Sequence, residues 1–302
     1  MKTIIKQSRR KAAFTIVELL TVMSIIVILI GLLVPALNKA KKYARDVKQR
    51  TQLHAIDAAI ELFNSEQDAY PPSGAKDEAP PPAAYNSRTD YCGAMKLAEA
   101  MMGQDLLGFH PESAFRSDGT TDGTANTHLY TKLTLNARKG PYLQLENANA
   151  YKLGDLYWEQ GMTTGPYNAD LFVLCDVYNR VTNKSNGKKV GMPILYYKAN
   201  TASTEHDLTD PDNPNNIYNY LDNYELVALG LPGQKPPPTG PTHDLIDPSP
   251  KRFYLNTIND QITLISRPYR ADSYILISAG YDGEYGTADD ICNFEWKYKP
   301  LP

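Results

Sequence analysis

The sequence has few of the residues on which cross-linking and catalysis usually depend. It holds 3 cysteines, 2 tryptophans and 5 histidines in 302 residues. Cys92, Cys175 and Cys292 are spaced too widely for a zinc ribbon or a Cys-x-x-Cys redox site. One pair could form a disulfide in an oxidising compartment, and unpaired buried thiols are an equal alternative. The sequence therefore leaves the state of the cysteines open.

Motifs for nucleotide and hydrolase chemistry are also absent from the sequence. There is no P-loop, no Gly-x-Gly-x-x-Gly and no Gly-x-Ser-x-Gly, and the histidines show no metal-ligand spacing. The formal net charge is −3 at pH 7, which gives no attraction to a phosphate backbone. We therefore expect neither an enzyme nor a nucleic-acid-binding protein.

Charge is nearly missing from the N-terminal segment that follows the first thirteen residues. The run from Phe14 to Val34 is 21 residues long and contains one charged residue, Glu18. At about 1.5 Å per residue it is long enough to span the ~30 Å core of a bilayer, and it exceeds the ~7–15 apolar residues of a removable signal. A carboxylate within such a run costs roughly 2.5–3.5 kcal/mol. The simple interpretation is a signal anchor, but Glu18 then needs a partner.

The first thirteen residues hold five basic residues and no acidic one. By the positive-inside rule we expect residues 1–13 in the cytoplasm and the rest of the chain on the other side of the membrane. Removal of this leader would change the net charge from −3 to −8. The exported part is therefore acidic.

Past Pro35 the apolar residues recur at intervals of three and four, as in an amphipathic helix. We expect one helix from residue 14 to about residue 66, with an amphipathic half over 35–67 that Pro35 kinks or loosens and that Tyr70-Pro71-Pro72 ends. The apolar stripe of the second half needs a globular head to cover it. The stripe comprises Leu37, Ala40, Ala44, Val47, Leu53, Ile56, Ala59, Ile60 and Phe63.

Residues 68–302 are expected to form that head. Val, Ile, Leu and Tyr content predicts strands within 170–181, 190–199 and 273–279. Helices are expected over 92–107 and over 215–229, the second capped by Asn215. The many tyrosines, 21 in all, suggest an exposed hydrogen-bonding surface. The predicted fold class is α+β: a long N-terminal helix packed on a small antiparallel β-sheet head with long loops.

The segment from Ser278 to Ile291 combines a strand end, glycines and four acidic residues. Calcium prefers six to eight oxygen ligands, and glycines let a short loop turn its oxygens inward. The spacing is not that of an EF-hand. Taken alone, Asp-Gly followed by Asp-Asp is more often a solvated turn than a calcium site.

The N-terminal residues Ala13-Phe14-Thr-Ile-Val-Glu18 resemble the processing site of type IV prepilins. In that family a basic leader is cut before a Phe, a Glu is fifth after the cut, and a proline stands where Pro35 does. The residue before the cut is usually Gly, whereas this chain has Ala13. The resemblance implies that a prepilin peptidase cuts between Ala13 and Phe14 and methylates the new amine. It also implies that Glu18 meets this amine of a neighbouring subunit in a filament.

The C-terminal segment resembles the calcium loop of the major pseudopilin family of type II secretion, general secretion pathway protein G. The segments 140–143 and 191–197 also resemble that family's head, in the same order, and 74–138 and 200–270 look like insertions. The resemblance implies calcium as a cofactor. Its ligands would be the carboxylates of Asp282, Asp289 and Asp290, carbonyls near Ala279 and Thr287, and the Ser278 hydroxyl.

Together these resemblances imply a structural subunit of a type II secretion pseudopilus. Its partners would be copies of itself, other pseudopilins, the prepilin peptidase and the inner-membrane secretion platform. It would cross the bacterial inner membrane once, with a cytoplasmic N-terminus and a periplasmic head. The alternatives are a type IV pilin-like surface filament subunit for adhesion, motility or uptake, with an extracellular head, and a carbohydrate-binding or enzymatic head on a pilin-type anchor.

Overall fold

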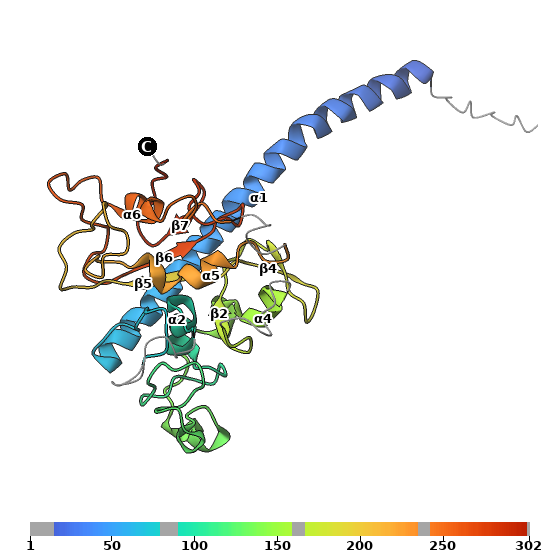
Figure 1. The fold of residues 1–302 in the computed structure, drawn as a ribbon. Helices are drawn as coiled ribbons and strands as arrows, with labels where there is room; N and C mark the ends of the chain where they lie inside the picture. Colours follow the sequence, from blue (N-terminus) through green and yellow to red (C-terminus); the bar gives the residue numbers. More distant parts are fainter. Residues whose placement is uncertain (1–14, 79–89, 159–166, 235–241, 301–302) are drawn as a thin grey trace, which may run out of the picture. The chain divides into compact units, whose positions relative to one another are not determined.

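The structure is a computed structural model that describes residues 15–78, 90–158, 167–234 and 242–300. The chain divides into two compact units, of which the first ends at Ala44 and the second begins at Arg45. Helix α1 (Ile16–Gln67) contributes to both units and is the blue helix of Figure 1.

The other helices of the described residues are α2 (Gly93–Met102), η2 (Ala125–Thr127), η3 (Lys132–Ala137), α3 (Leu145–Ala148), α4 (Leu153–Leu156), η5 (Tyr220–Asp222), α5 (Tyr224–Ala228) and α6 (Lys251–Thr257). The strands are β1 (Ala150–Lys152), β2 (Phe172–Leu174), β3 (Val181–Thr182), β4 (Lys189–Val190), β5 (Leu195–Lys198), β6 (Tyr274–Ser278) and β7 (Ile291–Cys292).

The first unit consists of the apolar half of α1. Its side chains are exposed from residue 15 to residue 41. Among the described residues, α1 is the one helix long and apolar enough to cross a membrane. Pro35 lies inside α1, and the helix continues through it without a break. This helix is compatible with a single N-terminal membrane anchor.

The second half of α1 belongs to the head, as its apolar stripe predicts. Leu53, Ile56, Ile60 and Phe63 are at most 2 % exposed. They pack into one core cluster with α2 and with one face of the main sheet. Packing of this amphipathic face is what fixes a helix to a globular core.

The main sheet has three antiparallel strands in the order β5-β6-β7. Leu195 pairs with Ile277 and Tyr197 with Ile275. Successive side chains of a strand point to opposite faces, and in β6 every residue is buried. Both faces of this sheet are therefore covered, which explains why β6 (Tyr-Ile-Leu-Ile-Ser) has no polar alternation.

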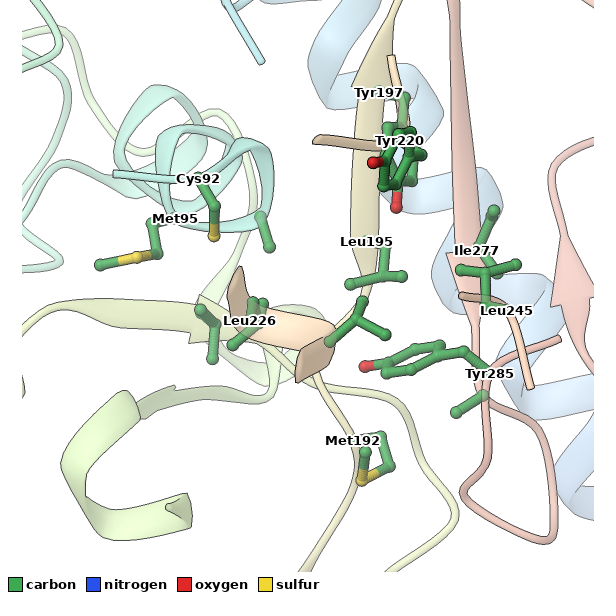
Figure 2. Close-up of a cluster of buried hydrophobic side chains, with 14 of the residues drawn as sticks. Cys92, Met95, Met192, Leu195, Tyr197, Tyr220, Leu226, Leu245, Ile277 and Tyr285 are labelled. Carbon is green, nitrogen blue, oxygen red and sulfur yellow. The ribbon is translucent and has the colours of Figure 1, made fainter. Parts of the chain in front are cut away.

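The two faces of the sheet belong to two different cores. Tyr196 and Leu276 lie in the cluster that contains the α1 stripe. Leu195 and Ile277 lie in the second cluster, with residues of α5 and α6. Figure 2 shows side chains of this second cluster from α2, β5 and β6 with Leu245 and Tyr285. Segment 200–270 thus supplies the layer over the sheet face opposite α1.

The expected tyrosine-rich surface is wrong for many of the 21 tyrosines. Tyr196, Tyr197 and Tyr274 are at most 1 % exposed. Their hydroxyl groups find partners inside the protein: the Tyr274 hydroxyl donates to Asp57 Oδ1 at 2.9 Å and the Tyr196 hydroxyl to the Pro71 carbonyl at 2.7 Å. Tyrosine suits such positions because it buries a large ring and needs only one polar partner.

Most of the strands and helices predicted for the head form within their predicted segments, and one predicted helix does not form. Strands β2, β5 and β6 and helix α2 lie within their predicted segments. The helix expected over 215–229 is wrong, because only η5 and α5 form there. Asn215 caps neither helix; Asn219 instead caps η5 by accepting the Leu221 N–H. The three cysteines are free and buried, which settles the question left open by their spacing.

Candidate functional sites

Glu18 takes part in the N-terminal cap of α1. The Thr15 N–H and hydroxyl donate to Glu18 Oε2 at 2.9 and 2.8 Å, and the Glu18 N–H donates to the Thr15 hydroxyl at 3.2 Å. This reciprocal pair is a capping box, in which two otherwise unpaired donors of the first turn are satisfied. Oε1 of Glu18 has no hydrogen-bond partner among the described residues. The carboxylate therefore has a local role and still keeps one oxygen for another partner.

The predicted processing residues Ala13 and Phe14 lie outside the described residues. Within the described part of α1, Glu18 is in the first turn. Pro35 lies seventeen positions further along the same helix and has no contact with Glu18. Of the four predicted N-terminal residues, the structure therefore describes Glu18 and Pro35 and does not bring these two together.

The predicted cation loop connects β6 to β7 and closes on itself. Gly280 has a φ of +64°, and a Cβ there would collide with the backbone carbonyl of Asp289. Asp289 Oδ2 accepts the Tyr281 N–H at 2.7 Å and the Asp282 N–H at 3.1 Å. Glycine is required here because it alone combines a left-handed backbone with so close an approach.

Three carboxyl groups of this loop converge on one hydroxyl. Thr287 Oγ1 lies 2.9 Å from Asp282 Oδ2, 3.0 Å from Asp289 Oδ1 and 3.4 Å from Asp290 Oδ1. A hydroxyl has one proton to donate, so it satisfies one of these acceptors at a time. The loop thus gathers more oxygen acceptors than it has donors for.

The pKa values of these carboxyl groups reflect their crowding. Burial, with a hydrogen bond to Asp289, raises the pKa of Asp282 to about 6. Burial also raises the pKa of Asp290 well above its usual value, and the charges of Asp282 and Asp289 add to this. For Asp289, burial is outweighed by hydrogen bonds from Asp282 and Thr287, and its pKa is lowered. A proton shared by Asp282 and Asp289 relieves the repulsion between their two carboxylate charges.

The remaining predicted ligands are Ser278, Ala279 and Thr287, and two of them have hydrogen-bond partners of their own. The Ser278 hydroxyl donates to Oδ2 of the buried Asp176 at 3.1 Å. Ala279 is fully buried next to it. The Thr287 carbonyl accepts the Trp296 indole N–H at 2.7 Å, which leaves it one lone pair.

Within the described ranges, no three Asp, Glu, His or Cys side chains form a ready metal site. Calcium also binds carbonyl and hydroxyl oxygens, so the loop has the donor chemistry for calcium in Asp282, Asp289, Asp290 and Thr287.

A buried histidine, which the sequence analysis did not single out, ties the loop to the segment 242–247. His243 is 0 % exposed, its Nδ1 accepts the Tyr285 N–H at 3.2 Å, and its ring lies 4.7 Å from the Tyr285 ring. The Leu245 N–H donates to the Tyr285 carbonyl at 2.9 Å. No local signal could reveal this contact, because its partners are 42 residues apart.

The fold and these sites define an α+β protein with one long apolar N-terminal helix. Comparison with family models, with curated proteins and with solved structures finds no match to this chain. The likeness to type IV pilins and pseudopilins rests on the sequence motifs.

Proposed function

We propose that this chain is a structural subunit of a type II secretion pseudopilus, anchored in the membrane and assembled through α1. The observation that carries the proposal is the exposed apolar half of α1, which has one carboxylate in its first turn and continues into the helix that holds the head. A helix that only anchors a head could be capped by a neutral side chain, and a charge within a membrane is costly. A subunit that packs side by side with copies of itself gains a fixed register from it.

In this proposal a prepilin peptidase removes residues 1–13 and methylates the amine of Phe14, leaving a cationic N-terminus. Oε1 of Glu18, which has no partner among the described residues, accepts a hydrogen bond from that cationic amine of a neighbouring subunit, while Oε2 keeps the cap with Thr15. Attraction between opposite charges is strong in a medium of low dielectric. The proposed contact therefore selects one register among the many that an apolar helix allows.

Calcium is the proposed cofactor of the head. Asp282, Asp289 and Asp290, with oxygens of Thr287 and Ala279, would hold the ion between β6 and β7. Its charge would replace the shared proton and stabilise the loop. We propose a periplasmic head on a single-pass inner-membrane helix, and a structural rather than catalytic role.

Two substitutions of Glu18 separate its proposed roles. Glu18→Ala removes both the cap and the charge, whereas Glu18→Gln keeps the hydrogen bonds of a capping box and removes only the charge. Both variants are expected to insert in the membrane and to lose residues 1–13 in cells with a prepilin peptidase, but to form no filaments. Mass spectrometry of the processed chain measures the first outcome. Electron microscopy of sheared cells measures the second, with each variant and the wild type expressed above the native level, where the wild type is expected to form filaments.

Normal filaments from Glu18→Gln would contradict the charge pair and leave Glu18 as a helix cap. Long head-labelled fibres of the wild type at native expression would favour the surface-pilin alternative. Failure of both variants and of the wild type to lose the leader would contradict the processing site at Ala13.

A further inference from the structure

A cleft of about 580 Å³ opens within segment 200–270 of the second unit. Its volume lies in the range of about 300–1,000 Å³ that is typical of small-molecule sites. Such sites are usually lined by apolar side chains, but ten of the twelve lining residues here are polar, and only Ala202 and Leu208 are apolar. The lining therefore favours a polar ligand. Neither α1 nor the loop between β6 and β7 contributes to it.

Hydrogen bonds within the chain hold the walls of this cleft in place. Asp207 Oδ1 accepts the N–H and the hydroxyl of Thr209 at 2.9 and 2.7 Å. It also accepts the Asp210 N–H at 3.2 Å, and Oδ2 accepts the side-chain amide of Asn213 at 3.1 Å. The buried Asn216 accepts the Asp207 N–H at 2.6 Å and donates to the Asp210 carbonyl at 3.3 Å. Walls that are ordered without a ligand lower the cost of ordering on binding.

Five exposed or half-buried side chains of the lining offer hydrogen-bonding groups that have no partner within the described structure. They are the hydroxyls of Ser203, Thr204 and Ser266, the side-chain amide of Asn215, and Oε1 of Glu205, whose Oε2 accepts the Ser266 N–H at 3.3 Å. Hydroxyls and amides both donate and accept, whereas a carboxylate only accepts. The free groups therefore match a ligand with several groups that can also do both, which is the property of sugar hydroxyls.

The charges around the cleft argue against anions and against calcium. Among the described residues that line it there is no Lys or Arg, the side chains that bind phosphate and carboxylate groups. Calcium takes six to eight oxygens, with carboxylates among them. Both oxygens of Asp207 already accept hydrogen bonds, which leaves one carboxylate oxygen, on Glu205. A neutral ligand fits this balance best.

We infer that this cleft binds a neutral saccharide. The free hydroxyls, the amide of Asn215 and Oε1 of Glu205 bond to hydroxyl groups of the sugar, and Ala202 and Leu208 contact its C–H groups. The site lies wholly within the second unit. It therefore stands whether or not the chain assembles into a filament or binds calcium.

The test is saturation-transfer NMR on the full chain, in a detergent that has no sugar headgroup. The probes are glucose, galactose, mannose, xylose and N-acetylglucosamine, each titrated alone, and at least one is expected to bind the wild type. The variant Glu205→Ala with Asn215→Ala removes two of the free groups and should bind that sugar at least about tenfold more weakly. Asn215→Ala alone repeats the test without breaking the bond between Glu205 and Ser266.

The matched control is Glu112→Ala with Asn126→Ala, at exposed positions outside the lining, and it should bind as the wild type does. Thermal unfolding checks that each variant is folded. Glucuronate and galacturonate should bind more weakly than glucose and galactose, because Glu205 repels a carboxylate. The inference would be overturned if none of the five sugars bound, if the cleft variants bound as tightly as the wild type, or if the control lost as much affinity. Tighter binding of the two acids would overturn the neutral class of ligand.

Discussion

At the residue scale, His206 is buried in a way that costs stability. It is 2 % exposed, its ring packs 4.9 Å from the Tyr254 ring, and neither ring nitrogen has a hydrogen-bond partner in the described structure. Burial lowers its pKa to about 3. The unfolded chain binds a proton here below about pH 6.5, whereas the folded chain does not until about pH 3. His206 therefore reduces stability as the pH falls below 6.5.

His206→Phe should accordingly stabilise the head. A ring of similar shape without unpaired nitrogens is expected to add about 1 kcal/mol at pH 7.5. The advantage should grow by about 1.4 kcal/mol for each pH unit below 6.5. Urea unfolding at pH 7.5 and pH 5 measures both. His54→Gln, at an exposed position, is the control and should show neither effect; a constant advantage at both pH values would show that His206 is not the titrating group.

At the scale of elements, the loop between β6 and β7 links calcium to pH. Burial raises the pKa of Asp282 to about 6, and burial also raises the pKa of Asp290 well above its usual value. In the cation-free protein Asp282 holds a proton that the unfolded chain has already lost, so its contribution to stability falls as the pH rises from about 4 through 6. Calcium needs the ionised carboxylates and must displace those protons.

Calcium should therefore raise the melting temperature of the head at pH 7.5 and have little effect at pH 5. Calorimetric melting with 1 mM calcium or with chelator, at both pH values, measures this. Asp282→Asn with Asp290→Asn should abolish the shift. Residues 117–124 form a second loop with two acidic residues. Asp118→Asn with Asp122→Asn in this loop should leave the shift intact, because Asp118 already pairs with Arg116. A shift of equal size at pH 5, or none at pH 7.5, would contradict the calcium proposal.

The sequence predicts elements where the signal is local, and fails where the partner is distant. The α1 stripe could be predicted because helix periodicity places Leu53, Ile56 and their neighbours on one side. The capping box is equally local, since Thr15 and Glu18 are three residues apart. The sequence analysis nevertheless predicts a role only for the charge of Glu18. The partner of Ser278 is 102 residues away, at Asp176, and no pattern in the sequence could assign it.

The failed helix over 215–229 has a physical cause in its asparagines. The side chain of Asn213 accepts the Asn215 N–H at 2.9 Å, and that of Asn216 accepts the Asp207 N–H at 2.6 Å. Such side-chain bonds compete with the helical ladder and favour turns. Strands as short as β7, two residues long, give no periodicity from which to predict them.

At the scale of the whole molecule, the stability of the head depends on the second unit alone. Both core clusters draw their buried residues from Leu53 onward, and the first unit ends at Ala44. The apolar half of α1 has no buried residue in the described structure. Its hydrophobic surface is therefore left for a membrane or for other helices, and the head does not need it to fold.

Residues 45–302, produced alone, should accordingly be monomeric and melt within a few degrees of the full chain in detergent. The matched substitutions are Ile56→Asp, at a position 0 % exposed, and Leu37→Asp, at a position 48 % exposed. Because a buried unpaired charge is costly, Ile56→Asp should destabilise the head by more than about 3 kcal/mol. Leu37→Asp should leave its melting unchanged and disturb only the membrane-facing part of the chain. The two units would be shown to fold as one if residues 45–302 alone were unfolded. The same would follow if Leu37→Asp lowered the stability of the head as much as Ile56→Asp does.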